Sequence, residues 1–428
     1  MRRIPAQLLI GTATSAYQIE GAIDNDWVAW EAADRLKVRG VRCGAGVDHL
    51  ERWEEDLALL HDVGAQVYRY SVEWSRIEPR AGEFDERALR HYADLTEVLR
   101  RRGVIPVVTL HHFTHPRWFH DRTPWETPAS VDAFARFTRT VVEALGPVPA
   151  YITFNEPMVL LLGGYIQGTI PPGRTDLKAF RRACENIVRA HVAARAVIKA
   201  FQPKAKVSIA HNVLRFAPAR GYLPTDRLSC QFANRFYNYS LPTALITGEL
   251  DLWAPLMVKH RAYFPEAEAS LDFIGLNYYS RVHLKTQLSS KSKIEPIYLD
   301  RAKRGLTDIG WEDYPQGLYL LLRGFARFGV PLWITENGID DRSGKRRSRF
   351  LYEHLSAVLK AVSEGVKVEA YLYWSLLDNF EWLEGFGPRF GLYQVDFRTN
   401  VRRATPTAGY LRQIIETRQL HAPEFVAA

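Results

Sequence analysis

Strand-like and helix-like segments alternate along the whole chain of 428 residues, and no linker, repeat or low-complexity tract separates them. This alternation limits the possible folds more than any other feature, because it is the pattern of parallel strands joined by helical crossovers. The strand-like segments are residues 8–13, 67–71, 105–110, 151–154, 207–210, 272–276, 332–335 and 368–373. They predict an α/β fold, a closed (β/α)8 TIM barrel, in which residues 1–428 form a single domain.

Amphipathic stretches lie between these strands. In residues 49–63, Leu50, Trp53, Leu57 and Leu60 recur at helical spacing. Further helices are predicted at residues 86–102, 129–145, 177–201, 230–246, 316–328, 349–363 and 407–418. In a (β/α)8 barrel the active site lies at the carboxyl ends of the strands, so residues that follow each strand are the candidates for function.

Two of the predicted strands end on a glutamate. Residues 332–338 read LWITENG and residues 150–157 read AYITFNEP, which places Glu336 and Glu156 directly after apolar runs. A carboxylate removed from water costs free energy unless it is paired or has a chemical role. Two carboxylates at the same end of one barrel predict a pair that faces a common space, which is the apparatus that cleaves a glycosidic bond.

Polar and aromatic side chains follow most of the other strands. Each has an ordinary structural explanation when taken alone, but together they offer hydrogen-bonding groups beside flat aromatic surfaces. A pyranose ring needs both, because it carries hydroxyls at its rim and C–H bonds on its face. The residues are Tyr17, Gln18, Glu20, Arg69, Glu73, Trp74, His111, His112, Asn155, Asn277, Tyr278, Tyr279, Asn337, Trp374, Ser375, Asp378, Asn379, Phe380, Glu381 and Trp382.

Composition excludes several other classes. The formal net charge is +8, but Lys and Arg are scattered, and the one dense run, residues 342–349, is interpreted as a solvated loop, so we expect no nucleic-acid partner. No apolar run approaches the roughly 18 residues of a membrane span, and no signal peptide fits the N-terminus. Cys43, Cys184 and Cys230 form no even framework, which indicates buried thiols and a cytoplasmic protein.

A barrel enzyme with different chemistry is a further alternative. An aldolase or isomerase would need a lysine at a strand end or clustered metal ligands, and neither is evident. His111, His112 and His115 come nearest to a metal cluster, but adjacent residues of an extended chain point in opposite directions. We therefore expect no metal and no cofactor.

The motifs, taken in order, resemble glycoside hydrolase family 1, the β-glucosidases and β-galactosidases with a (β/α)8 barrel. The resemblance runs from Leu8 to about Tyr410. It rests on GTATSAYQIEG at residues 11–21, YRYS at 68–71, WSRI at 74–77, TFNEP at 153–157, ITENG at 334–338, WSLLDNFEW at 374–382 and RFGL at 389–392. Each motif is moderately specific, and their joint order is very specific.

This resemblance implies roles for individual residues. Glu336 would be the nucleophile and Glu156 the acid/base of a retaining β-glycosidase, whose carboxyl groups stand about 5–5.5 Å apart. Gln18, His112, Asn155, Glu381 and Trp382 would hold the sugar hydroxyls, and Trp374 would stack beneath the ring. Arg69, Asn277 and Tyr279 would orient the nucleophile.

The implied substrate is a small β-glycoside or short oligosaccharide with an unphosphorylated terminal sugar. The family's carboxylate at position 381 accepts from the 4- and 6-hydroxyls and would repel a 6-phosphate. β-Glucosidase activity is expected, with activity on β-galactosides and β-fucosides. Thr114 and His115 depart from the family's usual Asp and Leu at the rim. A transglycosidase and a non-catalytic sugar-binding member stay open as alternatives, and the oligomeric state is unassigned.

Overall fold

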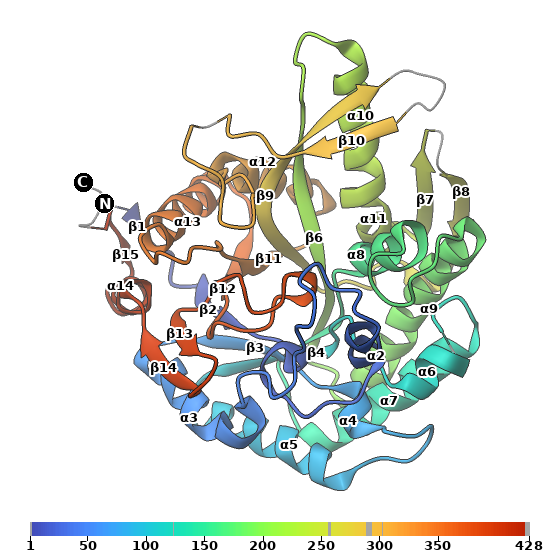
Figure 1. The fold of residues 1–428 in the computed structure, drawn as a ribbon, viewed down its shortest axis with the longest axis vertical. Coiled ribbons are helices and arrows are strands. Elements are labelled where there is room, and N and C mark those ends of the chain that lie inside the picture. Colours follow the sequence, from blue (N-terminus) through green and yellow to red (C-terminus); the bar gives the residue numbers. More distant parts are fainter. Residues whose placement is uncertain (1, 123, 256–257, 288–292, 302, 424–428) are drawn as a thin grey trace.

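Eight parallel strands close into a ring at the centre of the computed structural model, which describes residues 2–122, 124–255, 258–287, 293–301 and 303–423 (Figure 1). Strand β2 pairs with β3 and with β12, and β9 pairs with β6 and with β11, so the ring has no open edge. The predicted barrel is confirmed. The strands are β2 (Leu9–Ala13), β3 (Val67–Ser71), β4 (Ile105–His111), β5 (Ala150–Asn155), β6 (Lys206–Pro218), β9 (Ile274–Gln287), β11 (Leu332–Asn337) and β12 (Val368–Trp374).

Long helices surround the ring. They are α3 (His49–Asp62), α5 (Glu86–Arg101), α7 (Ala129–Leu145), α9 (Leu177–Phe201), α12 (Pro315–Phe325), α13 (Arg347–Ser363) and α14 (Pro406–Thr417). Asp85 and Asp176 are the N-cap residues of α5 and α9. Each side chain accepts hydrogen bonds from two free backbone N–H groups of the first turn. These helices lie close to where the sequence predicts them.

Alternate residues of each strand face two different apolar cores. Val67 and Ile152 point into the barrel, whereas their neighbours Tyr68 and Tyr151 point outward against the helices. This alternation follows from the two-residue period of a strand. The inward-facing side chains therefore fill the interior of the barrel.

Strands β6 and β9 are longer than predicted. The sequence predicts their ends at residues 210 and 276, but they continue as a ribbon that rises above the ring (Figure 1). Phe216, Val282 and Leu284 form a separate apolar cluster on this ribbon, which explains why the strands remain paired outside the barrel. Strand β10 (Lys293–Ile297) adds to β9 in the antiparallel direction.

One predicted helix is interrupted in the structure. Residues 230–246 form three pieces, namely α10 (Pro224–Ala233), the π-helical segment η2 (Asn234–Tyr239) and α11 (Ser240–Thr247). A π-helical segment carries additional residues per turn, which an amphipathic pattern does not reveal. The hairpin of β7 (Glu249–Ala254) and β8 (Val258–Tyr263) follows and was not anticipated.

Short elements occupy the loops. They are α1 (Ala16–Ile19), α2 (Asp26–Ala32), α4 (Trp74–Ile77), α6 (Arg117–Arg122), α8 (Pro157–Leu162), η1 (Gly163–Gln167), η3 (Pro265–Ala267), η4 (Ala326–Phe328), η5 (Trp382–Glu384), β13 (Tyr393–Asp396) and β14 (Val401–Ala404). β1 (Arg2–Arg3) pairs with β15 (Gln419–Leu420), which brings the two ends of the described chain together.

The arginine-rich run at 342–349 is not a solvated loop throughout. Helix α13 begins at Arg347, whose buried guanidinium donates to the carbonyl oxygens of Asp341, Arg389 and Gly391. These carbonyls lie in loops, and the guanidinium ties the loops together by adding a donor to each carbonyl oxygen. The basic run is thus partly a structural feature.

The cysteines are free, with Cys43 and Cys184 buried and Cys230 partly buried. Within the described part of the chain, no helix has both the length and the apolar character that a bilayer crossing requires.

Candidate active site

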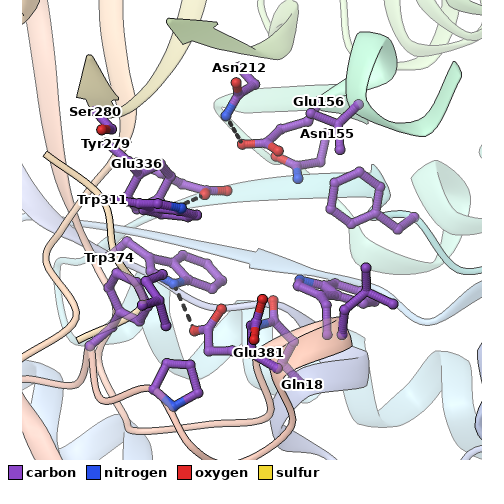
Figure 2. Close-up of a pocket in the computed structure, with 18 of the residues that line it drawn as sticks. Gln18, Asn155, Glu156, Asn212, Tyr279, Ser280, Trp311, Glu336, Trp374 and Glu381 are labelled. Atoms are coloured by element: carbon purple, nitrogen blue, oxygen red, sulfur yellow. Dashed lines mark hydrogen bonds between the residues drawn. The ribbon is translucent and has the colours of Figure 1, made fainter. Parts of the chain in front are cut away.

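A cavity of about 350 Å³ opens at the carboxyl ends of the barrel strands, and both glutamates line it. Figure 2 shows their carboxyl groups pointing toward each other across this space. Most of the other predicted site residues also line the cavity, namely Gln18, His112, Asn155, Tyr279, Trp374, Glu381 and Trp382. Arg69 and Asn277 lie beneath it and contact the residues that do.

Glu336 lies near the end of β11 and is held on both carboxylate oxygens. Arg69 of β3 donates to Oε1 over 2.7 Å, and the hydroxyl of Tyr279 donates to Oε2 over 2.6 Å. The side chain of Arg69 is fully buried and that of Glu336 is 5% exposed. A buried ion pair is tolerated when the remaining donors are satisfied, and Arg69 also donates to Thr109 and Asn155.

Glu156 follows β5 in a left-handed backbone conformation, with φ of 45°. Its Oε1 accepts from the amide groups of Asn277 at 2.9 Å and Asn212 at 3.0 Å. Tyr237 in turn donates to Asn212 Oδ1 over 2.7 Å, which fixes the orientation of that amide. These neighbours of Glu156 are neutral amides, in contrast to the cation that contacts Glu336. Asn277 lies beside Glu336 in the register of β9 and β11, as expected, and its amide also donates to Glu156.

The two carboxyl groups differ in the charges and hydrogen bonds that act on their pKa values. Burial, and then the charge of Glu336, raises the pKa of Glu156 to about 7. Burial also raises the pKa of Glu336, but the charge of Arg69 and the hydrogen bond from Tyr279 oppose that rise. One carboxyl group is thus suited to carry a proton near neutral pH and the other to carry a charge.

Asn155 connects Arg69, the partner of Glu336, to His112. Its Oδ1 accepts from Arg69 at 2.7 Å and from Asn277 at 3.0 Å, and its Nδ2 donates to His112 Nε2 over 3.1 Å. Burial lowers the pKa of His112 well below its usual value, so the ring is neutral and Nδ1 carries its proton. This Nδ1 has no partner among the described residues and is free to donate to a ligand.

Aromatic rings form one wall of the cavity. The rings of His112 and Trp382 are nearly parallel, at 9° and 5.9 Å between centroids, and Trp374 lies 6.1 Å from His112. Trp374 also donates from Nε1 to Glu381 over 3.2 Å, shown by a dashed line in Figure 2. Burial raises the pKa of Glu381 to about 8, so this carboxyl group is protonated in the free protein at pH 7.

Gln18 also lines the cavity, and hydrogen bonds hold its side chain in one orientation. Its Nε2 donates to Asn379 and to the carbonyl oxygen of Phe380, and its Oε1 accepts from Ser15. Its orientation is therefore determined before a ligand arrives, which reduces the entropic cost of binding.

Several residues of the predicted ring turn away from the cavity. Glu20 accepts from Tyr92 and Arg76, and Glu73 accepts from Ser75 and Thr114. His111 packs among aromatic rings on the opposite side of the chain from His112. These residues support the loops.

Sequence reasoning missed several residues that line the cavity. Asn212, Leu214, Tyr237, Tyr298 and Trp311 all line the cavity. The signal for Asn212 was available, because it lies two residues past the predicted end of the fifth strand, and no polar residue was assigned to that strand. Tyr237 and Tyr298 come from the π-helical segment η2 and from just beyond β10, so no strand-end rule finds them.

Comparisons with known proteins agree with this geometry. The family model described as glycosyl hydrolase family 1 matches residues 1–420. Beta-glucosidase A of Thermotoga maritima is 32% identical, over 96% of this chain and 97% of its own length. The solved beta-glycosidase from Pyrococcus horikoshii has a TM-score of 0.91 at 34% identity and covers 99% of this chain and 97% of its own.

A second solved structure, the beta-glucosidase from Thermotoga maritima in complex with glucoimidazole, has a TM-score of 0.89 at 31% identity, over 98% of this chain and 100% of its own. The barrel, the paired glutamates and the family match over nearly the whole chain lead to one conclusion. The chain belongs to glycosyl hydrolase family 1 and is a β-glycosidase, an O-glycoside hydrolase.

Proposed function

We propose that this β-glycosidase hydrolyses terminal non-reducing β-D-glycosyl residues with retention of configuration. Glu336 attacks the anomeric carbon, Glu156 gives its proton to the departing oxygen, and a covalent glycosyl-enzyme forms. Glu156 then takes a proton from water, whose oxygen displaces Glu336 and releases the β-sugar. The single observation that carries this assignment is the unlike surroundings of the two carboxyl groups, a cation and a phenol at Glu336 against two amides at Glu156.

The charges support both steps of the cycle. Before attack, the negative charge of Glu336 favours the protonated form of Glu156. Once Glu336 is esterified, that charge is gone and Glu156 ionises more readily, as the second step requires. The dependence of kcat/KM on pH should therefore be bell-shaped. Its basic limb should lie near pH 7, because deprotonation of Glu156 removes the acid.

We propose a β-glucoside as the main substrate, with β-galactosides and β-fucosides also accepted. Trp374 would stack on the sugar face, and Gln18, His112, Asn155, Glu381 and Trp382 would bind its hydroxyls. A carboxyl group can serve both epimers at the 4-position, because it can hydrogen-bond an equatorial or an axial hydroxyl. The related Thermotoga maritima beta-glucosidase solved with glucoimidazole supports a glucose-sized ligand.

We also propose that residues 1–428 act as one catalytic domain, since strands from both ends of the chain complete one ring. The free thiols of Cys43 and Cys184 support a cytoplasmic location, because buried unbridged thiols are typical of reducing compartments.

The proposal is tested by measuring the release of p-nitrophenol from the p-nitrophenyl β-glucoside, β-galactoside and β-fucoside. The wild type and Glu336→Ala are compared. The variant should lose turnover and regain part of it with azide, giving an α-glycosyl azide. Glu369→Gln is the matched control, because this glutamate lies near the amino end of β12 and pairs with Lys206 away from the cavity. The product anomer is read by NMR.

Different outcomes separate the alternatives. A β-anomer as first product supports retention, whereas an α-anomer contradicts it. Release of p-nitrophenol without an equal amount of free sugar, in the presence of an alcohol acceptor, indicates a transglycosidase. Sugar binding without turnover by the folded wild type indicates a non-catalytic protein.

A further inference from the structure

Asp26, His115 and His120 gather behind the aromatic wall of the active site. Asp26 is the first residue of α2, His115 lies in the loop between β4 and α6, and His120 belongs to α6. Each offers one metal-ligand atom, and these three atoms lie within 4.8 Å of one another. None of the three contacts the cavity directly.

The carboxylate of Asp26 is only half satisfied. Its Oδ1 accepts from the backbone N–H of His115 at 3.0 Å, and the backbone N–H of Asp26 donates to the carbonyl oxygen of His115. Its Oδ2 is buried and has no hydrogen-bond partner among the described residues. Glu73 places a second negative charge nearby. Burying an unpaired carboxylate is costly, so this oxygen requires a cation or a proton.

A second histidine–aspartate pair in the same molecule has hydrogen-bond donors on both carboxylate oxygens. His49 Nδ1 lies 2.8 Å from Asp56 Oδ2, and Arg402 donates to both oxygens of that aspartate. Asp26 receives no arginine in the described structure, and His115 Nε2 stays 3.5 Å from its Oδ2. This distance is longer than that of a well-formed hydrogen bond.

The two histidines present ring nitrogens close to the carboxylate of Asp26. Each ring contributes one nitrogen to the set of three ligand atoms. His115 Nδ1 faces His111 Nε2 at 3.4 Å, so it can donate its proton there and leave Nε2 free toward Asp26. Such an outer hydrogen bond is how metal-binding histidines are usually oriented.

We propose that Asp26, His115 and His120 bind a divalent cation of the zinc type. Imidazole nitrogens and carboxylate oxygens both suit Zn²⁺ at ligand distances of about 2.0–2.2 Å, so the three ligand atoms would draw together by roughly 1 Å. Three protein ligands leave a fourth position for water. His120 is partly exposed, which gives the ion a way in. This proposal revises the expectation of no metal, which was based on His111, His112 and His115.

The cation would act on the shape of the active site, and no chemical step requires it. It would join α2 to the loop after β4. Helix α2 carries Trp27, whose ring lies 4.6 Å from that of Trp382, and the loop after β4 begins at His112. Holding these two segments together would keep the sugar-binding wall in place. Loss of the ion should therefore raise KM and lower the Tm. It should change kcat less than it changes KM.

The experiment begins with protein stripped by a chelator and dialysed against metal-free buffer. Titration with ZnCl₂ in a calorimeter should show one site per chain, and Zn²⁺ should raise the Tm by several degrees. Co²⁺ at the same site should give visible absorption bands of a four-coordinate ion. His120→Gln should reduce zinc affinity at least about 100-fold, because even second-shell changes cost 10–100-fold.

The matched control is His61→Gln, which removes an exposed histidine at the end of α3. It should bind Zn²⁺ like the wild type. His120 is only partly buried, so its variant should fold, and circular dichroism checks this; Asp26→Asn provides a second variant. The proposal is overturned if the wild type binds no Zn²⁺ at 100 micromolar (on the order of loose surface binding), or if His120→Gln binds as tightly as His61→Gln.

Discussion

At the scale of single residues, Asn212 shows how a neutral neighbour adjusts the proposed acid. Its amide donates to Glu156 Oε1 over 3.0 Å and lowers the pKa of that carboxyl group. Asn212→Ala should therefore raise the pKa of Glu156 and move the basic limb of kcat/KM to higher pH. The maximal kcat/KM should fall about tenfold, because a hydrogen bond to a charged group is worth about 1.5–3 kcal/mol.

The measurement is the pH profile of p-nitrophenyl β-glucoside hydrolysis. Tyr237→Phe is the milder companion variant, because it removes only the hydroxyl that orients Asn212. A basic limb that moves to lower pH in Asn212→Ala would contradict the assignment of Glu156 as the acid.

Glu381 supports a second prediction at this scale. The expected rejection of a 6-phosphate depends on a negative charge at this position, but the pKa of Glu381 in the free protein is about 8. The group is neutral below that pH and charged above it. The ratio of kcat/KM for the β-glucoside to that for the 6-phospho-β-glucoside should therefore rise as pH increases through about 8.

Measuring both substrates at each pH cancels the common effect of Glu156. Glu381→Gln should give a ratio that does not change with pH, because an amide does not titrate in this range. A ratio that falls with pH in the wild type would show that Glu381 does not govern this selectivity.

At the scale of elements, the ends of β11 and β12 approach closely beside the proposed nucleophile. A Cβ atom added at Gly338 would lie 2.0 Å from the carbonyl oxygen of Trp374, so this position accepts only glycine without a shift of backbone. Gly338→Ala should separate the two strand ends, lower kcat at least about tenfold and reduce the Tm, because positioning errors near 1 Å cost up to about 10²-fold in rate.

Gly409→Ala is the matched control, because a Cβ at that position in α14 meets no atom within 4 Å. It should leave kcat unchanged and stabilise the protein by about 0.4–1 kcal/mol through the unfolded state. Thermal unfolding and initial rates of both variants provide the comparison. Equal activity of the two variants would mean that the strand ends tolerate separation.

At the scale of the whole molecule, the chain ends close the barrel at the side opposite the active site. Arg418 donates to the carbonyl oxygens of Pro5 and Leu8 and to the side chain of Gln66. Arg418→Ala should leave the carbonyl oxygen of Leu8 without this donor, while Pro5 and Gln66 keep the backbone donors of Leu8 and Ile10, and it should lower the free energy of unfolding by about 1–3 kcal/mol. KM and kcat should not change, because the site lies at the other end of the strands.

Differential scanning calorimetry of Arg418→Ala beside Arg412→Ala checks this prediction. Arg412 is exposed and forms an ion pair with Glu416 on the same helix, so its loss should cost less than about 0.5 kcal/mol. Similar Tm values for the two variants would show that the chain ends do not stabilise the barrel.

The sequence by itself determined the barrel, its strands and most of the candidate site. Apolar strands that end in polar residues carry a local signal, because a parallel barrel brings every carboxyl end to the same face. Glu156, Glu336, Gln18, His112 and Trp374 were found in this way. The predicted positions of six strands held because each is a short apolar run, whereas β6 and β9 continue past their predicted ends.

Only the tertiary structure decided which hydrogen-bond partners each side chain has. Asn277 contacts Glu156, Glu20 turns away to Arg76, and Glu381 takes a raised pKa from burial, none of which a linear pattern contains. Asp26 and His115 are 89 residues apart, and they meet because α2 packs against the loop after β4. Hydrogen bonds and desolvation depend on distance in space, whereas sequence patterns report only the face on which a residue lies.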